Sequence, residues 1–88
     1  MIQKFLSFLT HEKRYSMHTI TAYEDDLNHF HSFLKLTFEI DDFHEVRHSH
    51  LRSWVVELIE AGISPRSVNR KIACLKSFFK FLWITKMD

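Results

Sequence analysis

The chain has 88 residues, of which 45% are hydrophobic, and a formal net charge of +1. This length predicts one domain with one modest core, and the single Gly and single Pro leave little room for the tight turns of a many-stranded β fold. No apolar run is long enough to span a membrane, no secretory leader is evident and one Cys cannot form an internal disulfide, so we expect a cytoplasmic protein built from long helices.

Residues 2–13 have the spacing of a short amphipathic helix. The apolar positions recur at i, i+3, i+4 and i+7, which places them on one side of a helix. They are Ile2, Phe5, Leu6 and Leu9. The polar side carries no distinctive chemistry, so we interpret this segment as a helix that packs against the rest of the domain.

A second helix is predicted over residues 17–36, with Ser16 as its N-cap. One side is apolar and consists of Ile20, Tyr23, Leu27, Phe30 and Leu34. The other side is polar and consists of His18, Thr21, Asp25, Asn28 and Ser32. This division predicts that the first side packs in the core and that the second faces solvent.

The start of this second helix offers several hydrogen-bonding side chains. Ser16 is followed closely by His18, Thr19 and Thr21, which can bond to phosphates or to base edges of DNA. On spacing alone, the better interpretation is that Ser16 and Thr19 only stabilise the helix end. The acidic residues 24–26 would repel DNA, which confines any contact to the first turn and a half of the helix.

Residues 37–46 show no clear period, and we expect a loop whose apolar side chains pack against the bundle. These are Phe38, Ile40, Phe43 and Val46. A third helix is predicted over residues 48–61, with an apolar stripe of Leu51, Trp54, Val55, Leu58 and Ile59. Gly62 is placed to end that helix in a left-handed conformation.

The last predicted helix begins at Pro65, after Ser64 as its N-cap. Its apolar face consists of Val68, Ile72, Leu75, Phe79, Leu82 and Trp83. Its opposite face consists of Arg66, Arg70, Ala73, Ser77 and Lys80. One side is therefore predicted to be buried and the other to be basic, and the helix N-terminus adds partial positive charge beside Arg66. This combination suits a phosphate backbone.

The charges are distributed unevenly along the chain. Residues 1–60 contain six Lys/Arg against ten Asp/Glu, whereas residues 61–88 contain six against one. The positive field is thus concentrated in the last helix and its approach. A basic face of this kind is more often simply solvated, so the charge pattern by itself does not establish nucleic-acid binding.

Metal and catalytic chemistry are not indicated. The pairs His29/His31 and His48/His50 are spaced i, i+2, which directs them to different sides of a helix, and no metal-ligand motif accompanies them. Cys74 lies between basic residues that could lower its pKa, but we interpret it as a small residue filling the outer face of the last helix. We expect no metal site, no cofactor and no complete active site.

Two segments together resemble a known family. The first reads S-x-H-T-I-x-A-Y-x-x-D-L-x-x-F-x-x-F-L from Ser16. The second runs from Leu51 to Leu58 and continues from Gly62 as G-I-S-P-R-S-V-N-R-K-I-x-x-L-K-S-F-F-K-F-L. In this order and spacing they resemble the N-terminal core-binding domain, also called the SAM-like domain, of tyrosine recombinases such as phage integrases and Xer-type proteins.

The resemblance implies an all-α fold, a four- to five-helix orthogonal bundle that closes one half of a C-shaped clamp around double-stranded DNA. Residues 1–86 would be the core-binding domain, and residues 87–88 would start a linker to a C-terminal catalytic domain that this chain lacks. The fragment would therefore not be an enzyme. Its first helix would contact other recombinase subunits in a four-subunit synaptic complex, exposing part of the Ile2–Leu9 stripe, whereas the isolated domain would be monomeric.

The resemblance also implies which residues meet DNA. They are Ser16, His18, Thr19, Thr21, Arg66, Ser67, Arg70 and Ser77, with Cys74 as a further candidate. The acidic residues between 37 and 46 and the low net charge depart from a typical DNA binder. The dissociation constant of the isolated domain for DNA would therefore be about 10⁻⁴–10⁻⁶ M. The alternative is a helical protein-interaction module whose basic face meets an acidic partner helix or solvent.

Overall fold

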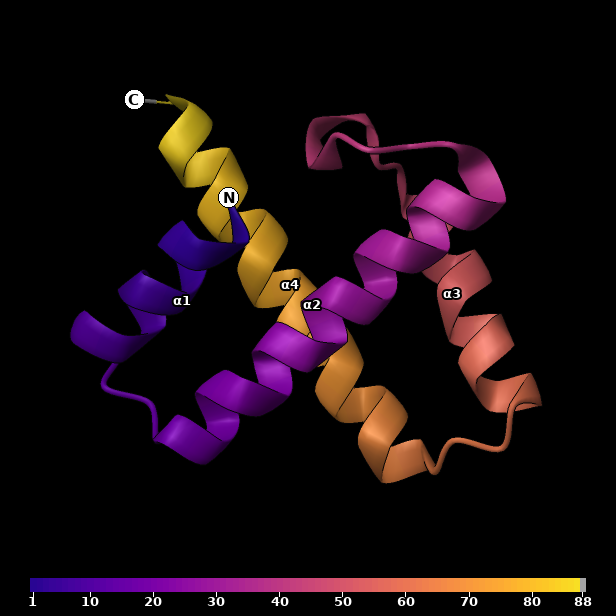
Figure 1. Cartoon of the computed structure of the whole chain (residues 1–88), viewed down its shortest axis with the longest axis horizontal. Helices are drawn as coiled ribbons and strands as arrows, with labels where there is room; N and C mark the ends of the chain where they lie inside the picture. The colour runs from indigo at the N-terminus through magenta and orange to yellow at the C-terminus, as the bar shows by residue number, and fades with distance from the viewer. Residues whose placement is uncertain (88) are drawn as a thin grey trace.

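The chain folds as a bundle of four α-helices in a computed structural model that describes residues 1–87, with side chains described for residues 1–83 (Figure 1). The helices are α1 (Ile2–His11), α2 (Met17–Phe38), α3 (His48–Glu60) and α4 (Pro65–Met87), and a short 3₁₀ turn, η1 (Phe43–Glu45), precedes α3. No strand is present within residues 1–87. The all-α prediction is therefore confirmed.

The helix ends follow the local chemistry of the sequence. Ser16 Oγ accepts a hydrogen bond from the Thr19 N–H, and Ser64 Oγ accepts one from the Ser67 N–H, each at 3.3 Å, so both predicted N-caps are confirmed. Gly62 has φ of 84° and ends α3 in a left-handed conformation. Two predicted bounds differ from the structure by two residues each, because α1 ends at His11 and α2 continues through Phe38.

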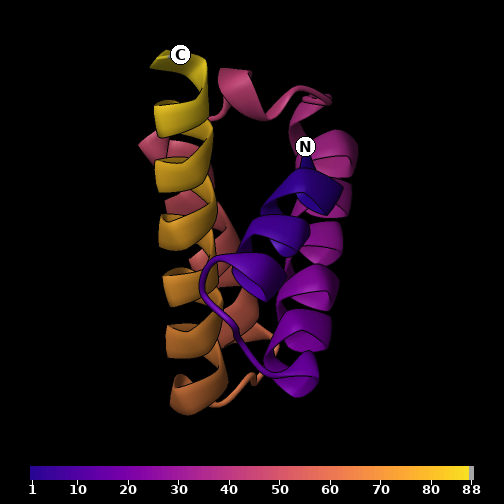
Figure 2. The same cartoon turned by 90° about the vertical axis from the view of Figure 1, so that its left-hand side faces the viewer.

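The bundle is flat, with principal extents of 35, 27 and 17 Å, so its shortest dimension holds only two layers of helices. Figure 2 looks along these layers and shows α4 on one side and α2 on the other. α2 packs against each of the other three helices, and α3 also packs against α4. The packing of α2 therefore fixes where each of the other helices lies.

The core is dominated by aromatic side chains. Phe78 is fully buried, and its ring centroid lies 5.3 Å from that of Phe5 and 4.8 Å from that of Phe43. Buried Phe43 belongs to the segment predicted as a loop that packs on the bundle, and Ile40 is also buried there as predicted. The α1 stripe is more covered than the resemblance implied, because Phe5, Leu6 and Leu9 are buried within this chain and Ile2 is half-buried.

The predicted faces of the helices require four corrections. Cys74 was expected on the outer face of α4 but is fully buried, and Trp83 was expected in the core but is 64% exposed. Phe78, absent from the predicted apolar face, is fully buried, whereas Ile59 on α3 is 61% exposed. On α4 the reason is that Cys74 meets Tyr23 of α2, whereas Phe78 meets Phe5 of α1 and Phe43 of η1, so the buried arc of the helix is wider than one apolar stripe.

The burial of Cys74 decides its chemistry. Its Sγ donates a weak hydrogen bond to the Tyr23 carbonyl oxygen at 3.8 Å. Burial, and secondly the nearby negative charge of Asp26, raise the pKa of the Cys74 thiol to about 12. The thiol is therefore protonated at neutral pH, and the alternative of a reactive thiolate activated by basic neighbours is wrong.

Candidate nucleic-acid interface

The N-terminal ends of α2 and α4 lie at the same end of the molecule, the lower edge in both Figure 1 and Figure 2. The first turn of each helix leaves backbone N–H groups without intrahelical partners and carries partial positive charge. We call this end, with Ser16, His18, Thr19, Arg66, Ser67 and Arg70, the N-terminal edge. Two separate helix starts thus present donors at one edge of the bundle.

Five of the sequence-predicted residues lie in the first turns of these two helices or beside them. Ser16, His18 and Arg66 are exposed, whereas Thr19 and Ser67 are half-buried. Thr19 Oγ1 lies 3.1 Å from Ser16 Oγ, and Ser67 Oγ lies 3.2 Å from Ser64 Oγ. Both hydroxyl pairs are therefore already used within the helix caps, as the structural interpretation of Ser16 and Thr19 predicted.

Two predicted residues do not join the N-terminal edge. Thr21 is exposed, but it lies on another side of α2. Asp26, five positions later, marks the side of α2 that meets α4, and Thr21 is about 140° around the helix from it. Ser77 is half-buried and lines a hollow between α1 and α4 together with Phe5 and Phe81. It lies about 15 Å along α4 from Ser67.

Arg70 sits at the inner margin of the edge, where it bonds to a buried carboxylate. Its Nη2 and Nε donate to the two Asp26 oxygens at 3.0 and 3.3 Å, and Lys71 Nζ donates to Asp26 Oδ1 at 2.7 Å. The Asp26 side chain is 1% exposed, that of Lys71 is 12% exposed and that of Arg70 is 45% exposed. Asp26 is therefore not a surface charge that repels DNA, and that expectation is corrected.

The exposed stripe of α4 differs from the predicted one. It runs along Arg66, Asn69, Ala73, Lys76 and Lys80, which are all exposed. Asn69 and Lys76 were not singled out from the sequence, although their spacing from Arg66 is helical. The side chains of Arg66, Lys76 and Lys80 make no ion pair with any described residue, so the stripe carries uncompensated positive charge.

The acidic residues between 37 and 46 lie at the far end of the molecule. The segment joining α2 to α3 is at the upper edge in both Figure 1 and Figure 2, opposite the N-terminal edge. It carries Glu39, Asp41, Asp42 and Glu45. Asp41 and Asp42 each contact a histidine, His31 and His44, at 3.0 Å. These carboxylates are therefore kept away from the starts of α2 and α4.

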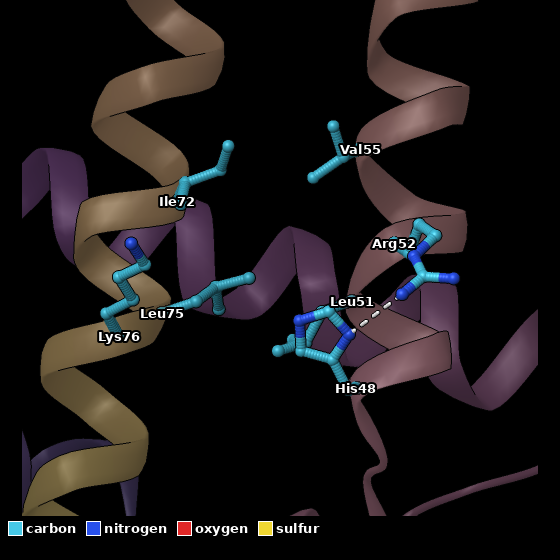
Figure 3. A pocket seen from close by; sticks show the side chains of 7 residues that line it. All are labelled: His48, Leu51, Arg52, Val55, Ile72, Leu75 and Lys76. Carbon is cyan, nitrogen blue, oxygen red and sulfur yellow. Dashed lines mark hydrogen bonds between the residues drawn. The ribbon is translucent and has the colours of Figure 1, made fainter.

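A second surface feature is a groove of about 310 Å³ between α3 and α4 (Figure 3). Its apolar lining comes from both helices and consists of Leu51, Val55, Ile72 and Leu75. Its rim is basic: Lys76 borders it on α4, and on α3 the Arg52 guanidinium donates to His48 Nδ1 at 3.3 Å. No carboxylate is among its lining residues in the described part of the chain.

Within the described residues, no group of three or more His, Cys, Asp or Glu side chains is close enough to hold a metal ion. Within residues 1–87, no helix has a stretch with the length and hydropathy needed to cross a lipid bilayer.

Comparison with known proteins gives a consistent result. The model of the phage integrase N-terminal SAM-like domain matches residues 2–86. The chain is 36% identical over 86 residues to tyrosine recombinase XerC of Bacillus subtilis and 42% identical over 82 residues to tyrosine recombinase XerD of Listeria monocytogenes. These matches cover 98% and 93% of this chain but only 28% of each relative. No solved structure matches significantly.

Proposed function

Because the chain belongs to the family of phage integrase N-terminal SAM-like domains, we propose that it binds duplex DNA as the N-terminal domain of a tyrosine recombinase. The observation that carries this proposal is the N-terminal edge, where the starts of α2 and α4 lie at one end of the bundle and the acidic segment lies at the opposite end. Arg66, in the first turn of α4, is exposed there. Positive charge and oriented N–H groups are what a phosphate backbone requires.

The proposal divides the residues by role. Arg66 and Arg70 would contact phosphates, His18 and Ser16 would approach the same backbone from α2, and Asn69 would reach base edges, because its amide can both donate and accept. Thr21 and Ser77 have no place in this contact. Lys76 and Lys80 would extend the positive stripe along α4 and add affinity that does not depend on sequence.

The rest of the parent protein would supply the chemistry. The chain spans about 28% of the length of the curated relatives it matches. We propose that strand cleavage and exchange belong to the part of such a protein that this chain does not include. We further propose that other recombinase subunits are partners of the full-length protein and that it acts in the cytoplasm.

Arg66→Glu tests the proposed face. We expect its affinity for duplex DNA to fall at least about tenfold at low salt, and the slope of log affinity against log salt to shrink by about one, because a phosphate contact is lost. Binding is measured by fluorescence anisotropy with a labelled duplex. Arg66 makes no ion pair within the described residues, so unfolding followed by circular dichroism is expected to be unchanged.

Lys35→Glu is the matched control, because it changes the charge equally but lies in the last turn of α2, at the acidic end. Its effect on affinity is expected to be small. Equal losses in the two variants would mean that only net charge matters, and an unchanged affinity of Arg66→Glu would remove Arg66 from the interface.

The groove between α3 and α4 favours a second candidate function, binding of an acidic amphipathic helix from a partner protein. Its apolar lining would accept the aliphatic side chains of such a helix, and the cations of Arg52 and Lys76 would pair with its carboxylates. The exposed Ile59 extends the apolar surface along α3. Charge complementarity thus selects an acidic occupant over a basic one.

A designed helix tests this second function. We expect a Leu/Glu amphipathic peptide of about 18 residues to give saturable shifts of groove amides in NMR spectra, and a Leu/Lys peptide to give none. Lys76→Glu is expected to abolish the response, whereas Lys80→Glu, which makes the same charge change outside the groove, is expected to retain it. Absence of saturation with both peptides would exclude this function.

A further inference from the structure

We propose that Asp26 is a positioning residue for DNA binding: it holds the Arg70 guanidinium in a fixed orientation at the N-terminal edge. This inference rests on the proposed function and deepens it. Asp26 does not itself reach the surface, since its side chain is 1% exposed. Its influence on a ligand must therefore pass through the groups that bond to it.

The geometry leaves part of Arg70 available. Arg70 Nε and Nη2 each donate one hydrogen bond to the Asp26 carboxylate, and the two nitrogens lie 3.3 and 3.0 Å from its two oxygens. The guanidinium has five N–H donors in a rigid fork, so three remain for a ligand. The Arg70 side chain is 45% exposed, which places those donors where an outside phosphate can reach them.

Lys71 makes this arrangement compatible with anion binding. Its Nζ lies 2.7 Å from Asp26 Oδ1, and its side chain is 12% exposed, so it neutralises the carboxylate from within the bundle. The three groups together carry one net positive charge, and the only one of them that is substantially exposed is Arg70. Asp26 therefore orients the guanidinium without cancelling the charge that a phosphate would meet.

The contact also ties the two halves of the edge together. Asp26 lies on α2 and Arg70 on α4, 44 positions apart in the chain. The same ion cluster that orients Arg70 thus holds the second turn of α4 against the third turn of α2. A phosphate-binding group is thereby held in register with the start of α2, where Ser16 and His18 lie.

Asp26→Asn separates positioning from simple electrostatics, because the two predict opposite changes in the affinity for DNA. The variant gains one positive charge, which by charge alone tightens DNA binding. If Asp26 positions Arg70, affinity instead falls by about threefold or more, because the freed guanidinium must be ordered on binding. Affinity is measured by anisotropy at temperatures where circular dichroism shows a fully folded chain. Tighter binding would show that Asp26 competes with the phosphate and would overturn the proposal.

A double-mutant cycle with Arg70→Gln completes the test and keeps the two proposals apart. In the Arg70→Gln background, Asp26→Asn is expected to cause no further loss, because no guanidinium remains to be positioned. If Arg70→Gln leaves affinity unchanged, Arg70 is not in the interface and that part of the proposed function fails. If Arg70→Gln weakens binding but Asp26→Asn weakens it equally in both backgrounds, only the positioning role fails.

Two further readouts cover the case in which Asp26→Asn does not fold. Arg70→Lys keeps the charge and leaves Asp26 neutralised by Lys71, and it is expected to lose affinity by about threefold or more because an ammonium lacks the fork. In the free wild-type chain, the Arg70 Nε–H group is expected to give a ¹⁵N heteronuclear NOE as high as the helix backbone. A wild-type affinity for Arg70→Lys, or a mobile Nε–H, would refute the positioning role.

Discussion

Replacing Asp26 with alanine is expected to destabilise the fold by about 3–5 kcal/mol, the range typical for a buried ion pair that loses one partner. Arg70 can turn to water, because its side chain is 45% exposed, but Lys71 is only 12% exposed and its ammonium would be left without a counter-charge. Lys71 Nζ also lies 5.9 Å from the Trp54 ring, which cannot replace a carboxylate. The free energy of unfolding is measured by urea denaturation.

Asp25→Ala is the matched control, because Asp25 is the exposed neighbour of Asp26 and its loss removes the same charge. Its effect is expected to stay within about 0.5 kcal/mol. In the double variant Asp26→Leu/Lys71→Met, which removes both buried charges, we expect most of the stability to return. An Asp26→Ala chain as stable as the Asp25→Ala chain would mean that the cluster contributes nothing to the fold.

Phe78→Ala is expected to cost about 3–5 kcal/mol, because it empties a fully buried site in contact with Phe5 and Phe43. Trp83→Ala, which removes a larger side chain from the same helix, is expected to cost at most about 1 kcal/mol, because Trp83 is 64% exposed. Both are measured by thermal and urea unfolding. A larger loss of unfolding free energy for Trp83→Ala than for Phe78→Ala would mean that α4 buries the predicted apolar face, which includes Trp83 and not Phe78.

The helices of this chain could be predicted from its sequence more fully than the sides that they bury. The helices and their starts could be predicted because caps such as Ser16 and Ser64 act on neighbours three positions away. The buried side of α4 could be predicted only in part. Periodicity describes one packing partner, whereas α4 has several: α2 covers Cys74, and Phe5 of α1 and Phe43 of η1 cover Phe78.

The ion cluster of Asp26, Arg70 and Lys71 could not be predicted from the local sequence pattern. Asp26 stands between the exposed Asp25 and the buried Leu27, and nothing in that run distinguishes a buried carboxylate from a solvated one. Its partners lie 44 and 45 positions away. The crossing of α2 and α4 would have to be known before Arg70 and Lys71 could be assigned to it. Individual helices can be predicted from a sequence more readily than the contacts made where they cross.

The position of the acidic segment has a consequence for how the molecule meets any polyanion. The carboxylates of residues 39–45 lie at the end opposite the starts of α2 and α4, although the net charge of the chain is only +1. A polyanion that approaches this segment is repelled. Collisions at that end are therefore disfavoured, and a larger share of the encounters falls to the opposite edge.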